Sequence, residues 1–329
     1  MKVLIVAPAW VGDMVMAHTL VQVLHADGNP TIEMLAPPAT APLAERMPGV
    51  AGAKVLDVRH GEWGLGKRRS MALDLRGGAF DVAYVLPNSF KSALVPYWAR
   101  IPQRIGWHGE GRFGVLNERR HLDRERYPLM IERFMALGRS AGAAIVKPYP
   151  QPRLTVDEDS RRAVVERLAL DLERPVTVLC PGAEYGGAKR WPERHFAAVA
   201  NHAAAAGHAV WLIGSPNDEP VCATIEALAS AAINLAGQTS LLDAVDLLSL
   251  AKQVVTNDSG LMHVAGALDR PVVALYGSTT PAFTPPLGEA AIVLHEDLDC
   301  RPCFQRECPL GHHDCLNRLD PGRVIEVLN

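Results

Sequence analysis

A short apolar run, a polar loop and a helix-forming segment follow one another repeatedly, and this pattern constrains the fold more than any other feature. The first copy is the run Lys2–Ala7, the loop Pro8–Gly12, and then Met16, Leu20 and Leu24 at helical spacing. A strand that is buried on both faces of a parallel sheet has a continuous apolar run of this kind. The N-terminal segment therefore predicts a strand, a loop and a helix.

The same alternation extends along the rest of the chain. In the first half, further strands are predicted at Thr31–Leu35, Val55–Val58 and Val82–Leu86. In the second half, strands are predicted at Val176–Cys180, Ala209–Gly214, Val254–Thr256 and Val272–Tyr276. Helices are predicted from about Asn217 and at Pro192–Ala206, Leu241–Ala251 and Asp258–Leu268. Strands that alternate with helices favour the α/β class with parallel sheets.

Length and composition favour two such domains. The chain has 329 residues, of which 48% are hydrophobic and 21% charged, and a soluble domain takes roughly 100–200 residues. These proportions exclude extended disorder and a fibrous repeat. The charged segment 157–174 precedes the first strand of the second half, so we predict domains at residues 1–165 and 166–310. A C-terminal segment, 311–329, follows, with a helix at Pro321–Leu328.

Charge and hydropathy exclude other classes of protein. The chain has 33 Lys and Arg and 36 Asp and Glu, a net charge of −3, so no overall positive field attracts nucleic acid. No stretch approaches the roughly 20 apolar residues that span a bilayer, and the apolar N-terminal run is too short for a signal peptide. We therefore expect a cytoplasmic protein whose cysteines do not form stable disulfides.

Ligands of such sheets bind beyond the carboxyl ends of the strands, where loops enter helices. This rule selects four loops, 8–14, 181–191, 215–219 and 257–263, with the loop 277–281 behind the last of them. In the loop 257–263, the helix start can bind a phosphate, Gly260 allows close approach, and Asp258 can accept hydrogen bonds from sugar hydroxyls. Alternatively, these residues are a helix N-cap followed by a core histidine.

Other loops of the second half carry further candidates. Lys189 precedes a predicted helix, where it can neutralise a diphosphate or be a solvated surface lysine. Asp218 or Glu219 can offer a carboxylate to sugar hydroxyls, and the loop 277–280 supplies hydroxyl donors. These loops lack the glycine patterns of dinucleotide-binding sites and P-loops, so both kinds of site are disfavoured.

In the first half, Gly12 and Asp13 end the first loop and open a helix. Asp13 is either the helix N-cap or a general base that takes the proton of an acceptor hydroxyl in the transition state. Basic residues give this half either a patch for an anionic acceptor or a set of solvated side chains: Lys67, Arg68, Arg69, Lys91, Arg100, Arg104 and Arg112.

Soft metal ligands gather near the C-terminus: Cys300, Cys303, Cys308 and Cys315, with His312 and His313. They are numerous enough for tetrahedral zinc, although only one CxxC pair is present. The alternative is that reduced cysteines stabilise a C-terminal loop.

Four segments resemble, in order, the lipopolysaccharide heptosyltransferases of glycosyltransferase family 9: KVLIVAPAWVGDMVMAHTL, FKSALVPYWARIPQRIGW, PGAEYGGAKRWPERHFAAVA and TNDSGLMHVAGALDRPVVALYGSTTP. The tail LDCRPCFQRECPLGHHDCL is more similar to the type II branch of the family than to the type I branch. The resemblance covers nearly the whole chain. It implies the GT-B fold, in which two Rossmann-like, doubly wound domains face a central cleft and the C-terminal segment returns to the N-terminal domain.

The resemblance also implies an activity. A family member of this type transfers L-glycero-D-manno-heptose from ADP-heptose to the first heptose of the Kdo–lipid A inner core, with inversion, in lipopolysaccharide biosynthesis. The N-terminal domain is then expected to bind the acceptor, and the C-terminal domain the ADP-heptose donor. No cofactor and no metal are expected. The lipid-linked acceptor implies peripheral contact with the cytoplasmic face of the inner membrane.

Residue roles carry over from the resemblance. Asp13 is the expected general base, Lys189 the ligand of the donor diphosphate, and Asp258 the ligand of the heptose hydroxyls. The helix start that binds phosphate contributes further donor ligands: Ser259, Gly260, Leu261 and His263. The acidic sugar ligand maps to Glu219, with Asp218 as an alternative. The expected acceptor-binding residues are Gly12, Lys91 and Arg104.

Other functions stay open at this point. The chain can be a heptosyltransferase I, or another transferase of the same family with a different acceptor. Alternatives of another class are a non-enzymatic nucleotide-sugar sensor and a zinc-dependent interaction module. These two predict ligand or metal binding without transfer.

Overall fold

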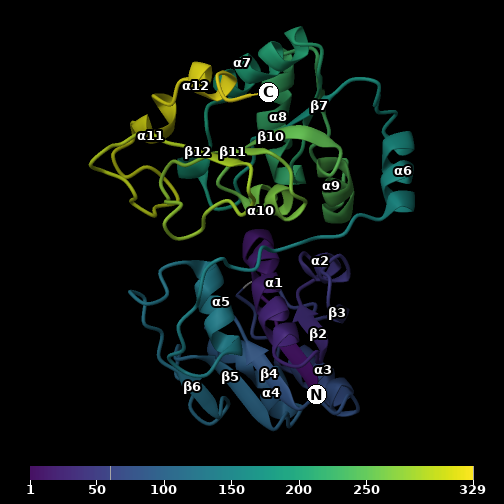
Figure 1. Ribbon diagram of the computed structural model, residues 1–329, viewed down its shortest axis with the longest axis vertical. Helices are drawn as coiled ribbons and strands as arrows, with labels where there is room; N and C mark the ends of the chain where they lie inside the picture. The colour runs from purple at the N-terminus through teal and green to yellow at the C-terminus, as the bar shows by residue number, and fades with distance from the viewer. Residues whose placement is uncertain (60, 329) are drawn as a thin grey trace. The chain divides into compact units, whose positions relative to one another are not determined.

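The computed structural model describes residues 1–59 and 61–328 of the chain. Two compact units, Met1–Pro152 and Arg153–Asn329, each contain one parallel sheet with its own helices (Figure 1). The predicted α/β class and the two doubly wound domains are therefore confirmed. None of the described helices combines the length and the apolar character needed to cross a membrane.

The first unit alternates strands with helices. Its strands are β1 (Lys2–Val6), β2 (Thr31–Ala36), β3 (Val50–Val55), β4 (Val82–Val85), β5 (Gln103–Trp107) and β6 (Glu118–Arg120). Its helices are α1 (Val11–Ala26), α2 (Ala41–Glu45), α3 (Leu65–Arg76), the 3-10 helix η1 (Phe90–Ala93), α4 (Leu94–Trp98) and α5 (Met130–Gly138).

The strand order of the first sheet brings two loops together. The order is β3-β2-β1-β4-β5-β6, and the neighbouring strands are parallel. The chain moves outward from β1 to β3 and then crosses to the other side of β1. The switch point between β1 and β4 is where ligands of such sheets bind. Asp13 and Lys91 lie in the first turns of α1 and η1, just after the loops that follow these two strands, so both residues are at the ligand edge of the sheet.

The second unit has the same kind of alternation. Its strands are β7 (Val176–Cys180), β8 (Ala209–Leu212), β9 (Ala232–Asn234), β10 (Ala251–Asn257), β11 (Val272–Leu275) and β12 (Ala291–Leu294). Its helices are α6 (Glu158–Arg167), α7 (Glu193–Ala205), α8 (Glu219–Leu228), α9 (Leu241–Leu248), α10 (Gly260–Ala267), α11 (Asp314–Asn317) and α12 (Pro321–Ile325). Two 3-10 helices are η2 (Gly187–Lys189) and η3 (Pro216–Asp218).

The second sheet repeats the topology of the first. Its order is β12-β11-β10-β7-β8-β9, so β7 and β10 occupy the places of β1 and β4. Every residue of β7 is buried, as expected for a central strand that is covered on both faces. The loops after β7 and β10 carry Lys189 and Asp258. The second switch point therefore places both predicted donor ligands at one edge of the sheet.

The described part of the C-terminal segment packs on the second unit. Leu316, Leu319 and Val324 are buried in the core of this unit, together with Leu179. The indole nitrogen of Trp191 also donates to the main-chain oxygen of Leu319 at 2.9 Å. These apolar side chains thus complete the core of the second unit, and the expected return of residues 311–329 to the N-terminal domain stays a prediction.

Two boundaries differ from the sequence predictions. The strand expected at Val55–Val58 lies earlier, at β3, because a paired edge strand needs less apolar character than a central one. The expected domain limit between residues 165 and 166 falls inside α6, which packs on α9 of the second unit. The first unit ends at Pro152 instead.

Candidate active site

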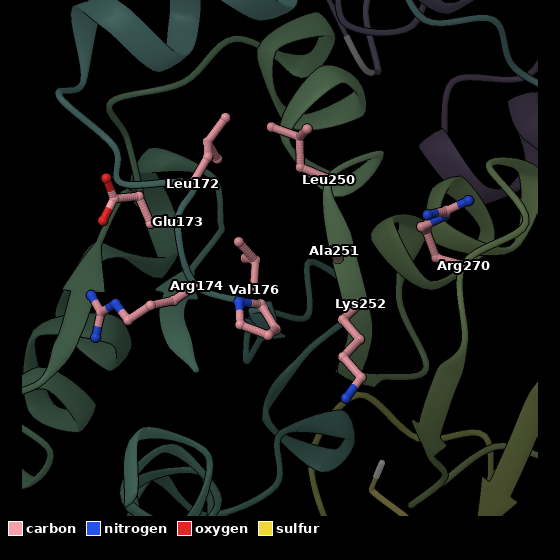
Figure 2. Close-up of a pocket in the computed structure, with 9 residues that line it drawn as sticks. Leu172, Glu173, Arg174, Val176, Leu250, Ala251, Lys252 and Arg270 are labelled. Carbon is pink, nitrogen blue, oxygen red and sulfur yellow. The ribbon is translucent and has the colours of Figure 1, made fainter. Parts of the chain in front are cut away.

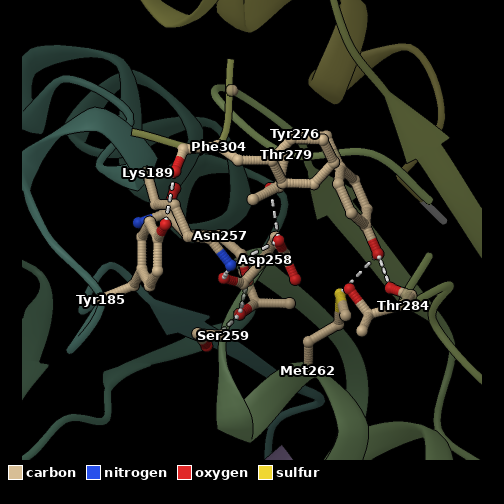
Figure 3. Close-up of polar contacts among 12 residues, drawn as sticks. Tyr185, Lys189, Asn257, Asp258, Ser259, Met262, Tyr276, Thr279, Thr284 and Phe304 are labelled. Atoms are coloured by element: carbon tan, nitrogen blue, oxygen red, sulfur yellow. Dashed lines mark hydrogen bonds and ion pairs between the residues drawn. The ribbon is translucent and has the colours of Figure 1, made fainter. Parts of the chain in front are cut away.

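A buried ion pair stands at the switch point of the second sheet. The Nζ of Lys189 lies 2.6 Å from Oδ2 of Asp258 and 3.3 Å from the main-chain oxygen of Asp258 (Figure 3). The two side chains are 14% and 4% exposed. Lys189 ends η2 and Asp258 follows β10, so the parallel order of β7 and β10 brings these distant residues together. The solvated-lysine alternative is therefore wrong.

The neighbouring loops hold this pair in place. Thr279 donates its hydroxyl to Oδ2 of Asp258 at 2.5 Å. The side-chain amide of Asn257 donates to the main-chain oxygen of Pro181 at 2.7 Å, and its oxygen accepts from the main-chain N–H of Trp191 at 3.1 Å. Asn257 thus ties the loop after β7 to the end of β10. The sequence analysis missed this role, although an amide at a strand end was a usable signal.

The start of α10 faces the same edge. Ser259 is the N-cap residue in extended conformation, and its side chain makes no capping hydrogen bond. Gly260 and Leu261, in the first turn, are half-buried. The first N–H groups of a helix have no partner within the helix, and the dipole favours an anion there. A phosphate is the natural ligand of this end.

His263 lies one turn into α10 and is buried. Burial lowers the pKa of His263 from 6.5 to about 4, with smaller opposite effects from Asp258 and Lys189. Its enclosed Nδ1 has no hydrogen-bond partner among the described residues. Because of the lowered pKa, the ring is neutral at neutral pH.

Acidification is expected to destabilise the chain through His263. In the unfolded chain the ring takes up a proton below pH 6.5, whereas in the folded chain it stays neutral to about pH 4. Stability conferred by the neutral ring is thus present above pH 6.5 and declines as the pH falls to 4. Between pH 7.5 and 5.0 the loss is about 2 kcal/mol. Urea unfolding at both pH values measures it, with His263→Asn as the comparison.

An equal pH dependence in His263→Asn would contradict this assignment. If the variant folds poorly, the ring nitrogen shifts of labelled histidine in the unmodified protein give a second measurement. A protonated His263 at pH 5.0 would be incompatible with the buried neutral ring.

Asp218 and Glu219 differ in their surroundings. Oδ2 of Asp218 accepts from the main-chain N–H of Ser215 at 3.0 Å and from its hydroxyl at 2.7 Å. The carboxylate of Asp218 is buried, and a Cβ on Gly182 would lie 2.4 Å from it. Glu219, at the start of α8, is exposed. Asp218 therefore shapes the loop after β8, while the side chain of Glu219 is open to solvent.

In the first unit, Asp13 lies in the first turn of α1. The N-cap residue of this helix is Trp10, and no side chain caps it. The interpretation of Asp13 as an N-cap is therefore wrong. Gly12 and Asp13 are half-buried and directly follow the loop after β1. This position at the switch point suits a carboxylate that acts on a bound ligand.

The basic residues of the first unit divide into two groups. Lys91 lies after β4 at the ligand edge and donates to the main-chain oxygen of Glu62 at 3.2 Å. Arg104 lies near the amino end of β5 instead, where its guanidinium donates to the main-chain oxygens of Val115 and Ile101 at 2.8 and 2.6 Å. The acceptor-binding role expected for Arg104 therefore does not fit its position.

Arg112 and Arg68 are not surface cations either. Arg112 is 1% exposed and donates to main-chain oxygens of Pro87 and Trp107. Burial lowers the pKa of Arg112 to about 10. Arg68 is also buried and donates to the oxygen of Trp63 at 2.8 Å. A guanidinium has five donors, so it can satisfy several loop carbonyls, which the sequence alone does not reveal.

The cysteines are all free thiols. Four backbone N–H groups, from residues 310–313, lower the pKa of Cys308. Within residues 1–59 and 61–328, no three His, Cys, Asp or Glu side chains are arranged to hold a metal ion. The zinc alternative thus gains no support from the geometry and stays a hypothesis.

A separate cavity of about 380 Å³ lies at the other edge of the second sheet (Figure 2). Its lining comes from the amino ends of β7 and β10 and the segments before them, including Arg174 and Lys252, with Arg270 ahead of β11. Figure 2 shows that these three cationic side chains point in different directions. The cavity is open and lies away from the switch point, so it is not the candidate site.

Comparison with known proteins agrees with this geometry. Residues 68–313 match glycosyltransferase family 9 (heptosyltransferase). The chain is 43% identical to lipopolysaccharide heptosyltransferase 2 of Escherichia coli K12, over 100% of this chain and 98% of the relative. It is 40% identical to lipooligosaccharide heptosyltransferase 2 of Haemophilus influenzae, over 100% and 99%. The solved structure of the E. coli ADP-heptose LPS heptosyltransferase II superposes with a TM-score of 0.90, at 43% identity, covering 100% of this chain and 98% of that one.

Proposed function

The chain belongs to glycosyltransferase family 9, the heptosyltransferases, and from this premise we propose that it transfers heptose from ADP-heptose to the first heptose of the Kdo–lipid A inner core. The observation that carries the proposal is the 43% identity, along the whole chain, to a lipopolysaccharide heptosyltransferase 2. The buried Lys189–Asp258 pair beside the start of α10 supplies a matching donor site.

The assay that tests this function uses purified protein, ADP-heptose and defined inner-core acceptors. ADP release and a product heavier by one heptose are expected only with an acceptor that already carries one heptose. Transfer to a Kdo acceptor without heptose would favour a heptosyltransferase I activity. Donor binding without transfer to any acceptor would favour a sensor.

On the donor side, negative charge gathers on the departing ADP. Lys189 and the N-terminus of α10 stabilise this charge, which makes C1 of the heptose electrophilic. Asp258 and Glu219 accept hydrogen bonds from sugar hydroxyls. Ser259, Gly260 and Leu261 bring main-chain N–H groups to a phosphate, and neutral His263 adds a polar atom behind them.

On the acceptor side, Asp13 takes the proton of the attacking hydroxyl. A carboxylate of ordinary acidity can do this because the hydroxyl becomes acidic as its bond to C1 forms. Attack opposite to the ADP leaving group inverts the anomeric centre, so no covalent enzyme intermediate is needed. Gly12 leaves room beside the acceptor, and Lys91 meets its acidic groups.

The acceptor is anchored in a lipid, so we also propose peripheral contact with the cytoplasmic face of the inner membrane. The α3 surface, defined here as Trp63, Leu65, Lys67, Arg69 and Leu73, supports it. The three apolar side chains are 57%, 51% and 48% exposed, and Lys67 and Arg69 are exposed as well. Leu65, Arg69 and Leu73 are four residues apart on one helix face. Exposed apolar and basic side chains together suit an anionic lipid surface.

Leu73→Glu is expected to weaken binding to vesicles that contain phosphatidylglycerol by about tenfold, because it removes apolar area and adds a negative charge. Co-sedimentation measures this binding. Leu228→Glu is the matched control, since Leu228 is 54% exposed on α8 of the second unit. Transfer to a short water-soluble acceptor should be unchanged in both variants. Equal vesicle binding by both variants would contradict the α3 surface.

A further inference from the structure

The segment that carries Cys300, Cys303 and Cys308 lies against the loops after β7 and β11. Arg301 and Phe304 contact the loop after β11, and Glu307 contacts the loop after β7. None of these residues was assigned a role by the sequence analysis. Their contacts connect this C-terminal segment to the loops around Lys189 and Asp258.

Arg301 holds the loop that contains Thr279. Its Nε donates to the main-chain oxygen of Gly277 at 3.0 Å, and its Nη2 donates to that of Thr279 at 3.0 Å. Its Nη1 donates to the main-chain oxygen of Glu296 at 3.2 Å. Burial lowers the pKa of Arg301. Three carbonyls in a fixed arrangement suit the planar fork of arginine and not the single ammonium of lysine.

Phe304 joins the loop after β11 to the loop after β7. Its main-chain N–H donates to the oxygen of Ser278, after β11, at 2.8 Å. Its main-chain oxygen accepts from the hydroxyl of Tyr185, after β7, at 2.6 Å (Figure 3). The ring of Tyr185 lies 5.0 Å from Nζ of Lys189. The main-chain N–H of Ala188 donates to the oxygen of Arg306 at 3.0 Å. Lys189 is therefore placed by contacts with residues 304–306.

The hydroxyl of Thr279 fixes the direction of the Asp258 carboxylate. Oδ2 of Asp258 accepts both from Thr279 and from Lys189, so this oxygen is occupied. No hydrogen bond to Oδ1 of Asp258 is found among the described residues. A carboxylate whose Oδ2 is held by a hydroxyl keeps Oδ1 in a constant direction, and this oxygen can accept from a sugar hydroxyl.

We propose that Thr279 and Arg301 are positioning residues for the donor sugar, Thr279 by orienting the Asp258 carboxylate and Arg301 by holding the loop of Thr279. This inference rests on the proposed transfer from a nucleotide sugar. Neither residue touches the reacting atoms. Both act through Asp258, so their loss affects the sugar part of the donor and not the diphosphate.

Thr279→Val tests the role of Thr279, because valine keeps the shape of threonine and lacks its hydroxyl. We expect the affinity for ADP-heptose to fall about tenfold, equivalent to about 1.4 kcal/mol, and the affinity for ADP to stay within about twofold. Titration calorimetry with both ligands measures this. Thr279→Ser should restore ADP-heptose binding. Thr284→Val, further along the same segment and outside the candidate loop, is the control and should bind both ligands as the unmodified protein does.

Arg301→Lys tests the role of Arg301, because lysine keeps the positive charge but lacks the planar guanidinium that contacts three carbonyls at once. The same selective loss is expected, at about tenfold in ADP-heptose affinity. Arg323→Lys is the matched control, since Arg323 also contacts the segment around Glu296 but does not reach the Thr279 loop. Thermal unfolding of each variant shows whether the fold is retained.

Several outcomes would overturn the proposal. They are unchanged ADP-heptose affinity in Thr279→Val, failure of serine to restore binding, or an equal loss for ADP and ADP-heptose. If the unmodified protein binds no ADP-heptose, the proposed function fails instead, so the two failures are distinguishable. If Arg301→Lys does not fold, the Thr279 and Thr284 variants still decide the role of the Thr279 hydroxyl.

Discussion

Asp13→Asn is expected to lower kcat about a thousandfold while the affinity for ADP-heptose stays unchanged. The amide has nearly the shape of the carboxylate, but it cannot accept the proton of the attacking hydroxyl. Asp13 is in the first unit and the donor ligands are in the second, so donor binding should not depend on it. Transfer rates under saturating donor and acceptor, together with calorimetry of donor binding, measure both effects.

Asp27→Asn is the matched control for this variant. Asp27 is the C-cap residue of the same helix α1, and its carboxylate pairs with Arg139 at 2.5 Å. This exposed pair contributes little to stability, so transfer should stay near the unmodified rate. If Asp13→Asn kept full turnover, Asp13 would not be the base.

Lys189→Ala has the second largest expected effect. It removes the cation that meets the donor diphosphate, so kcat/KM for ADP-heptose should fall about a hundredfold or more. It also leaves Asp258 buried without its partner, which costs about 3–5 kcal/mol of folding stability. Steady-state rates with varied ADP-heptose and thermal unfolding measure the two effects separately.

Two further variants separate binding from stability. In Lys189→Ala combined with Asp258→Asn, no carboxylate is left unpaired, so stability should recover while donor use stays low. Lys252→Ala removes an exposed lysine of the same unit and should change neither property. Donor dependence that is unchanged in Lys189→Ala would remove Lys189 from the phosphate site.

The central strands and the switch-point residues could be predicted from the sequence. A strand such as Val176–Cys180 is apolar throughout because both faces are covered, and this leaves a clear signal. Asp258 follows such a strand directly, and Asp13 and Lys189 follow the loops after two others, so the topology places all three at the ligand edges. The edge strand β3 has a mixed pattern, and its position was predicted wrongly for that reason.

The direction of a long side chain could not be predicted in this way. Arg104 and Arg112 were predicted to be surface cations, yet their guanidinium groups donate hydrogen bonds to carbonyls of distant loops. The contacts of Arg301 and Thr279 could not be predicted either. Arg301 contacts a loop that is distant in the sequence, and Thr279 contacts a residue that follows a different strand. These contacts depend on which loops the folded sheets bring together, and the local spacing of apolar residues does not indicate this arrangement.

The Lys189–Asp258 pair can persist while an anionic ligand binds. An ammonium has three N–H donors, and the Nζ of Lys189 contacts only two acceptors on Asp258, Oδ2 and the main-chain oxygen. One donor is thus left for a phosphate, and Oδ1 of Asp258 is left for a hydroxyl. We infer that the two buried charges stay together when such a ligand enters and leaves, so the second unit avoids the cost of an unpaired buried carboxylate at each turnover.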